Sequence, residues 1–327
     1  MTPARYHREV AALRVRGDGR RARYCRAVET ITMPSSVGIR FAHAALQVLA
    51  EEYGIDLLHI KGPAVDNSLL QASEVADSPV ARRSIDADVL VRPEHVDRLF
   101  AAMRQHGWSM KYRFEDGSAF EHAATMVHPV LAPVDVHRRF PGLGIDEDAA
   151  FDRLWAERHT IDIAGVPCPV PSVTAQRLML IVHAARGGAL DHPDIRRSWT
   201  AASEAERHAV QALAADLGSE VALAAGTGRL HEYVGAPGYE LWLALSTGEI
   251  SLVRIWAARV RAAPSRRAAL RTAVRLLVPN ARRMETALGR RPTARELSRA
   301  YLARTRWGVR EIRKTLRARR ARVGAGR

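Results

Sequence analysis

The stretch Ser84-Ile85-Asp86-Ala87-Asp88-Val89-Leu90-Val91 is an apolar segment that aspartate interrupts twice. Successive side chains of an extended strand point to opposite faces, so Asp86 and Asp88 share one face and most of the apolar residues line the other. Two neighbouring carboxylates repel each other unless a cation neutralises them, and their oxygen atoms suit Mg²⁺ or Mn²⁺. An edge strand with two acids in water has the same alternation, so this segment alone leaves both interpretations open.

A second segment, Pro133-Val134-Asp135-Val136-His137, repeats this pattern further along the chain. Asp135 and His137 point to one face of the predicted strand, and the two valines point to the other. A third carboxylate therefore stands on a later strand. A surface strand with its polar residues outward is the alternative, and it stays open for His137 more than for Asp135.

A Lys-Gly-Pro turn follows the strand predicted over residues 55–60. Lys61 is one of only three lysines among fifty basic residues, and it directly precedes Gly62. A compact ammonium beside backbone N–H groups at the end of a strand can hold a phosphate. A turn lysine without a ligand is the alternative, because a lone Lys-Gly pair is also common in ordinary turns.

The composition indicates a globular chain, and its length is sufficient for two domains. Of the 327 residues, 47% are hydrophobic and 26% are charged, which is ordinary for a soluble protein with a sizeable core. No apolar run approaches the length of a membrane span and the N-terminus lacks the apolar segment of a secretory signal, so we expect a cytoplasmic protein. The two cysteines, Cys25 and Cys168, indicate neither a disulfide framework nor a zinc site.

The positive charge is concentrated at the C-terminal end. Residues 251–327 contain 23 Lys and Arg against 3 Asp and Glu, whereas residues 1–250 contain 27 against 32. The helix predicted over residues 293–320 is both basic and amphipathic. Such a region favours a polyanionic partner, either a nucleic acid or an anionic membrane surface, and a solvated helical surface is the alternative.

The pattern of elements predicts an α+β fold, with a small mixed β-sheet and flanking helices followed by an all-helical C-terminal half. Strands are predicted at residues 55–60, 84–91, 108–112, 119–127, 134–137, 160–163 and 166–170. Helices are predicted at residues 35–54, 64–70, 94–106, 151–155, 173–186, 193–200, 203–216, 219–226, 238–247, 250–262, 265–278 and 293–320. Residues 115–118 are predicted to form a turn, residues 160–163 and 166–170 a hairpin, and Ser172 the N-cap of the helix that follows it. The predicted domains are a basic arm (1–34), an α/β domain (35–170), a helical domain (171–262) and a basic helical region (263–327).

In their order, these motifs resemble the polymerase-β-type nucleotidyltransferase superfamily. The chain is most similar to a bacterial branch of uncharacterised nucleotidyltransferases, in which a Lys-Gly turn stands where most members have Gly-Gly or Gly-Ser. The resemblance covers roughly residues 35–200. The matching segments are residues 59–62, 82–91 and 134–137, and His122 and His128 fit the histidine-bearing strand between them.

The resemblance implies a Mg²⁺-dependent enzyme, with Mn²⁺ as a second candidate ion, that moves a nucleoside monophosphate from an NTP such as ATP to a hydroxyl acceptor and releases pyrophosphate. It implies the following site residues: Asp86, Asp88 and Asp135 as catalytic metal ligands, Lys61, Gly62, Arg82 and Arg83 as nucleotide-binding residues, and His137 beside the metal ligands or the acceptor. The chain departs from the family at Gly62-Pro63, where Gly-Ser would supply a hydroxyl contact to the phosphates. The interval from Gly62 to Asp86 is also longer than in the shortest members.

Three other functions compete with this interpretation. A glycosyltransferase also uses Asp-x-Asp, but only about 85 residues precede Asp86 here, too few for its nucleotide-binding domain. A decayed transferase that binds RNA or an anionic membrane through its basic tail is the main alternative, and a purely structural α/β protein is the plainest one. For the acceptor, the tail favours RNA such as a tRNA end, while a protein, a peptide or a small molecule suits the α/β half equally well.

Overall fold

The computed structural model describes residues 33–71, 84–117, 120–188, 190–247, 257, 260 and 265–324. The chain divides into a unit Met1–Pro34 and a unit Ser35–Arg327. Three predictions fall mostly or wholly outside the described residues: the basic arm, the helix at residues 250–262 apart from residues 257 and 260, and the pair Arg82 and Arg83. The predicted domain boundaries stay predictions.

A five-stranded mixed sheet forms the centre of the second unit, in the order β1-β2-β5-β4-β3. The strands are β1 (Leu57–Ile60), β2 (Ala87–Val91), β3 (Ser109–Tyr112), β4 (Ala123–Val127) and β5 (Val134–His137). β2 runs parallel to β5, and every other neighbouring pair is antiparallel. A separate two-stranded hairpin, β6 (His159–Ile163) with β7 (Val166–Val170), confirms the hairpin predicted there.

The two faces of the sheet carry different side chains because strand residues alternate. One face presents residues such as Val89 and Val136 to a core that includes helices α1 (Ser35–Glu52) and α3 (Val96–Gln105). The opposite face presents Leu58, Ile60 and Leu90 to a second core, which includes α5 (Glu147–Ala156) and α6 (Val173–Ala185). The helical half therefore packs on the face to which Asp88 belongs, since Asp88 and Leu90 have the same parity.

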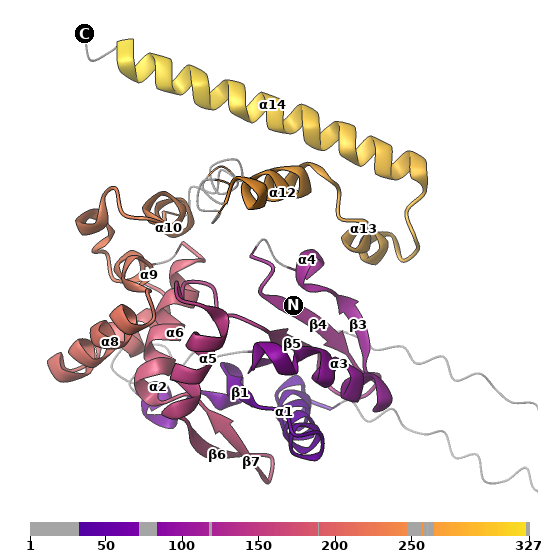
Figure 1. The fold of residues 1–327 in the computed structure, drawn as a ribbon, viewed down its shortest axis with the longest axis vertical. Coiled ribbons are helices and arrows are strands. Elements are labelled where there is room, and N and C mark those ends of the chain that lie inside the picture. Colours follow the sequence, from indigo (N-terminus) through magenta and orange to yellow (C-terminus); the bar gives the residue numbers. More distant parts are fainter. Residues whose placement is uncertain are drawn as a thin grey trace, which may run out of the picture. The chain divides into compact units, whose positions relative to one another are not determined.

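The C-terminal half is helical, as predicted, and Figure 1 shows α8 and α9 beside α6. After α6 come α7 (Pro193–Ile195), a π-helical turn (Arg196–Thr200), α8 (Glu204–Asp216), α9 (Glu220–Gly226), a 3-10 turn (Leu230–Tyr233), α10 (Tyr239–Ser246), α12 (Arg266–Leu277), α13 (Ala281–Leu288) and α14 (Ala294–Gly324). Ser172 caps α6 as predicted, because its side chain accepts a hydrogen bond from the N–H of Ala175. Helix α13 was not predicted from the sequence.

The remaining short elements precede or interrupt the sheet. They are a 3-10 turn (Gly62–Ala64), α2 (Asn67–Gln71), a second 3-10 turn (Pro93–His95) and α4 (Phe114–Gly117). The turn predicted at residues 115–118 is wrong, because the chain is helical up to Gly117 and acidic residues stabilise its first turn. The strand predicted at residues 119–127 begins only at Ala123, since Glu121 has a φ of 53°, which excludes it from a strand.

The basic helices α12 and α13 contact β3, α4 and the segment just before β4 through polar side chains. Arg275 on α12 forms an ion pair of 2.8 Å with Glu121. The Asn280 amide donates to the carbonyl of Asp116 at 2.9 Å, and the Tyr112 hydroxyl donates to Thr286 on α13 at 3.0 Å. In the part of the chain that the structure describes, no helix is both long enough and apolar enough to cross a membrane.

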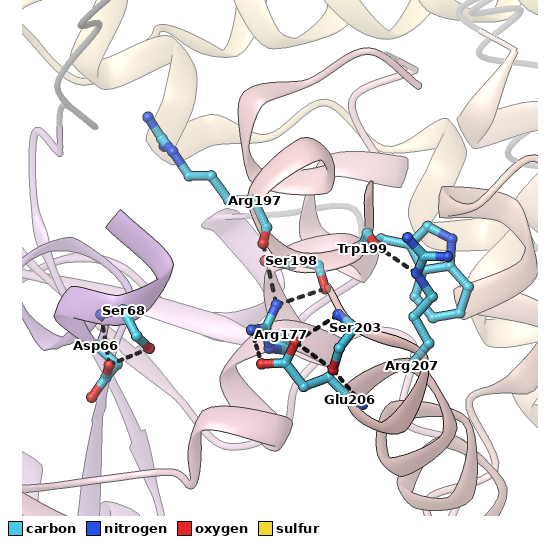
Figure 2. A network of polar contacts seen from close by, with 9 residues as sticks. All are labelled: Asp66, Ser68, Arg177, Arg197, Ser198, Trp199, Ser203, Glu206 and Arg207. Carbon is cyan, nitrogen blue, oxygen red and sulfur yellow. Dashed lines mark hydrogen bonds and ion pairs between the residues drawn. The ribbon is translucent and has the colours of Figure 1, made fainter. Parts of the chain in front are cut away.

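Arg177 fixes the position of α6 through a buried polar network (Figure 2). Its Nη1 donates to the carbonyls of Arg197, at 3.2 Å, and Ser198, at 3.3 Å. Its Nη2 forms an ion pair with Glu206 on α8. Because Glu206 also closes the capping box of α8 with Ser203, one guanidinium joins α6, the π-helical turn and α8.

Replacing Arg177 by Met is expected to lower the free energy of unfolding by about 2–3 kcal/mol, because two buried carbonyls lose their donor. Urea unfolding measures the change. Arg229→Met is the matched control, since Arg229 pairs with Glu232 on the surface, where a pair contributes about 0–1 kcal/mol. Equal losses in the two variants would contradict a special role for the buried network.

Candidate active site

Two carboxylates meet where the parallel strands β2 and β5 pair. Asp88 is the register partner of Asp135, and both lie on the sheet face that the helical half covers. Thr125 on β4 is the register partner of Asp135 on its other side, and its hydroxyl donates to Asp135 Oδ1 at 2.6 Å. Ligand atoms of Asp88, Asp135 and His137 all lie within 4.8 Å of one another.

Asp88 is a buried carboxylate with two nitrogen partners on one oxygen. Lys61 Nζ donates to Asp88 Oδ1 at 2.8 Å, and His137 Nε2 lies 2.7 Å from the same oxygen. Burial alone would raise the pKa of Asp88, but Lys61 and His137 outweigh it and hold that pKa well below its usual range. Asp88 is therefore ionised at every physiological pH.

Asp86 lies in the bend just before β2, which begins at Ala87. Burial raises the pKa of Asp86 to about 6, and the negative charges of Asp88 and Asp135 act in the same direction. The three predicted carboxylates thus lie close enough to repel one another. Asp86 itself is outside the compact group of ligand atoms, in which His137 is the third member.

The Lys61-Gly62 turn points the ammonium inward. Lys61 has a φ of 58° and Gly62 a φ of 47°, and a left-handed conformation in a non-glycine residue costs about 1–3 kcal/mol. The ion pair with Asp88 accompanies this strained backbone. A side chain at Gly62 would be strained by this positive φ, although its Cβ would make only ordinary contacts, 3.4 Å from both Cβ and Oγ of Ser84.

Two fully buried histidines, His43 and His59, lie close to this turn. Only His59 belongs to a segment that the sequence analysis identified, residues 59–62. His43 on α1 faces His59 on β1, with their Nδ1 atoms 2.8 Å apart. His59 Nε2 lies 3.0 Å from Gln47 Oε1, and the Gln47 amide donates to Glu51. Burial lowers the pKa of His43 to about 4 and that of His59 well below 6.5, so both rings are neutral. The spacing of four residues between His43, Gln47 and Glu51 could have shown from the sequence that these polar side chains share one face of α1.

Aromatic rings continue from the carboxylates toward the helical half. The ring of His137 lies 5.1 Å from that of His122, which lies 6.2 Å from that of Phe120. Burial lowers the pKa of His122 to about 2, and the positive charges nearby, Arg186 among them, act in the same direction. His128, by contrast, lies past the end of β4, where its Nδ1 accepts hydrogen bonds from the backbone of Val130 and Leu131.

The donor set fits a hard divalent cation. Asp88 and Asp135 offer carboxylate oxygens from neighbouring strands, and Mg²⁺ is typically bound by one or two carboxylates together with substrate phosphates. Burial, together with the neighbouring charges of Asp88 and Asp135, raises the pKa of Asp86, and a bound cation would offset both effects. His137 is held toward Asp88 by a hydrogen bond, so its ring orients a carboxylate rather than replacing one.

Replacing Asp86 by Asn is expected to stabilise the metal-free protein above pH 6. The native carboxyl, with a pKa of about 6, binds its proton more tightly than the unfolded chain does near 3.8, so native stability falls as the pH rises through that window. Asparagine removes this cost, which is on the order of 1–3 kcal/mol. Urea unfolding in EDTA at pH 7.5 and pH 4 measures the gain, and a gain of equal size at both values would contradict the charge repulsion.

Comparison with known proteins supplies a family for this site. Residues 36–235 match the model of a family described as uncharacterised nucleotidyltransferase. No curated protein matches the chain. Two solved structures are similar: the antibiotic-resistance factor ANT(2'')-Ia, with 18% identity over 61% of this chain and 96% of that one and a TM-score of 0.35, and an antigenic nucleotidyltransferase-like protein from Paracoccidioides brasiliensis, with 16% identity over 58% and 94% and a TM-score of 0.34.

Proposed function

The chain belongs to the family of uncharacterised nucleotidyltransferases, and we propose that it transfers a nucleoside monophosphate from an NTP to a hydroxyl acceptor in a Mg²⁺-dependent reaction. The observation that carries this proposal is the pairing of Asp88 with Asp135 on adjacent parallel strands. Lys61 adds a cation on the same buried carboxylate. In the balanced reaction the acceptor hydroxyl loses its proton, its oxygen bonds to the α-phosphorus, and pyrophosphate leaves with the broken P–O bond.

In this mechanism Asp86, Asp88 and Asp135 hold the divalent ion. The ion supplies charge neutralisation at the reacting phosphate and at the leaving pyrophosphate. Asp135 also takes up the proton of the acceptor hydroxyl, and the hydrogen bond from Thr125 to its Oδ1 holds the carboxylate in one orientation. The hydrogen bond between His137 and Asp88 likewise holds the Asp88 carboxylate in one orientation.

Lys61 and Gly62 bind the phosphates at the strand end. The Lys61 ammonium donates one N–H to Asp88 and keeps two further N–H bonds for phosphate oxygens. Its strained backbone places this charge at the site before substrate arrives, which reduces the reorganisation that binding requires. Arg82 and Arg83, which precede the Asp-rich strand in sequence, are proposed as further phosphate ligands.

For the acceptor we propose RNA, such as a tRNA end. The exposed side chains of α12–α14 are rich in arginine, and of the three acids in residues 251–327, Glu296 already pairs with Arg290 at 2.7 Å. The remaining arginines form an excess of positive charge that suits a phosphate backbone. A protein, a peptide or a small molecule is the acceptor if RNA receives no label in the transfer experiment.

The transfer experiment incubates the protein with each α-labelled NTP and Mg²⁺, and offers total tRNA, a protein extract or a small-molecule extract separately. Asp88→Asn and the double variant Asp86→Asn/Asp88→Asn are expected to lose at least about a hundredfold in transfer, because the charge that develops on the phosphates is no longer compensated. Asp97→Asn on the exposed start of α3 is the matched control.

The outcomes are distinct. Label in one acceptor pool that disappears with EDTA and with Asp88→Asn supports the reaction and identifies the acceptor class. Full transfer by Asp88→Asn would overturn the assignment of the carboxylates. No transfer to any pool, together with no Mg²⁺-dependent binding of NTP, would favour the decayed transferase that acts through its basic tail.

Binding of tRNA is expected to weaken steeply with salt, because each phosphate that the protein neutralises releases a counterion. Replacing four exposed arginines of α14 by glutamine (Arg295, Arg299, Arg306 and Arg310) should reduce the slope of log K against log salt concentration by about one for each phosphate that is no longer bound. Fluorescence anisotropy from about 50 to 200 mM salt measures the slope. An unchanged slope would place the RNA elsewhere, and binding to anionic vesicles but not to tRNA would identify a membrane surface instead.

A further inference from the structure

Arg186, at the C-terminal end of α6, is a cation that has no anionic partner among the residues that the structure describes. Its Nη2 lies 3.0 Å from Nδ1 of His183, one turn earlier on the same helix. Its Nε is buried and has no hydrogen-bond partner. Among the described residues no carboxylate forms an ion pair with it, whereas Arg177 on the same helix pairs with Glu206.

The surroundings of Arg186 make the lack of an anionic partner costly. Its guanidinium lies 5.6 Å above the ring of Phe120. Burial lowers its pKa to about 10, so the group is desolvated yet still charged at neutral pH. A desolvated charge without a partner is strongly destabilising. Its place at the C-terminal end of α6 offers only part of the compensation. It also leaves Nε without an acceptor among the described residues.

Arg186 is also connected to the carboxylate site. The neighbouring rings of Phe120, His122 and His137 lead from its guanidinium to Asp88, and the charge of Asp88 acts to raise the pKa of Arg186. The helical half thus presents a cation to the same sheet face on which the carboxylates lie. An anion that binds between Arg186 and the carboxylate site would compensate the charge of Arg186 without contacting the oxygens of the carboxylates directly.

The Lys61-Gly62 turn alone offers few groups that can bind phosphate, which explains why α6 would supply a further cation. Pro63 follows Gly62, so this position offers neither a hydroxyl nor an N–H to a phosphate. A triphosphate carries several negative charges, of which one ammonium neutralises only one. A guanidinium binds two phosphate oxygens at once, which an ammonium does not.

We propose that Arg186 is a binding residue for the terminal phosphates of the NTP, presented from the helical half and oriented by His183 and Phe120. The inference rests on the proposed function for the identity of the ligand, a polyphosphate anion. It assigns to α6 the phosphate contact that the turn at Gly62-Pro63 lacks. Arg186 then distinguishes a nucleoside triphosphate from a nucleoside monophosphate.

Arg207 is the matched control for the test. It too is a partly buried arginine over an aromatic ring, 5.8 Å from the centroid of Trp199. Its Nε donates to the carbonyl of Trp199 at 3.0 Å (Figure 2). Its Nη2 donates to the carbonyl of Thr200 at 2.8 Å, so protein acceptors already occupy both of these donor nitrogens. Loss of Arg207 reports the general effect of removing a stacked arginine.

The experiment measures binding by calorimetry with the full-length chain and Mg²⁺, using ATP, tripolyphosphate and AMP as probes, or whichever nucleotide the transfer assay selects. Arg186→Gln is expected to weaken binding of the triphosphate and of tripolyphosphate by about 10- to 100-fold, the value of a hydrogen bond to a charged group. AMP should bind equally well to the variant and the wild type. Arg186→Lys, which keeps the charge but not the paired donors, should lie between them, and Arg207→Gln should bind as the wild type does.

Triphosphate binding by Arg186→Gln within about twofold of the wild type would overturn the inference, as would equal losses for triphosphate and AMP, or no binding of any polyphosphate to the wild type. If Arg186→Gln fails to fold by circular dichroism, the Arg186→Lys variant decides in the same way. Failure of the proposed function is distinguishable, because a wild type that binds the triphosphate through Arg186 but labels no acceptor retains the site and loses only the transfer reaction.

Discussion

The repulsion between Asp88 and Asp135 is the constraint on which the rest of the structure depends. Parallel pairing of β2 with β5 puts these carboxylates at register-matched positions on one face of the sheet, and Asp86 adds a third charge nearby. Burial of like charges is tolerated only where cations compensate them. Lys61, carried on a strained left-handed backbone, supplies one such cation from the neighbouring strand end, and His137 supplies a hydrogen bond.

The helical half brings a further cation to the same face of the sheet. Because α6 packs on the carboxylate face, its C-terminal end brings Arg186 to the row of rings that starts at His137. The position of α6 depends in turn on Arg177, whose guanidinium ties it to the π-helical turn and to α8. Arg177, which has an anionic partner, thus lies on the helix whose C-terminal end carries Arg186, which has none among the described residues. The first has a structural explanation within the protein, and the second points to a ligand.

Much of the fold was predictable because hydrophobic alternation reports strands directly. The period of two around Asp88 and Asp135 located β2 and β5, and the serine cap located the start of α6. The prediction was wrong where one residue broke the pattern: Glu121 adopts a positive φ, so β4 starts at Ala123 and α4 replaces the predicted turn. The contact between His43 and His59 was not predicted, because the two residues lie on different elements that come together only when α1 packs on β1.

The sequence by itself determined which residues are the candidates for the chemistry. Local alternation and order distinguish Asp86, Asp88 and Asp135 from the other acids, and the lysine before Gly62 was conspicuous in a chain that otherwise uses arginine. Only the tertiary structure decided which side chains touch: Lys61 and His137 share one oxygen of Asp88, and Arg186 lies over the ring of Phe120. The physical reason is that periodicity records which way a side chain points along its own element, whereas contact depends on how strands pair and helices pack across long separations in the chain.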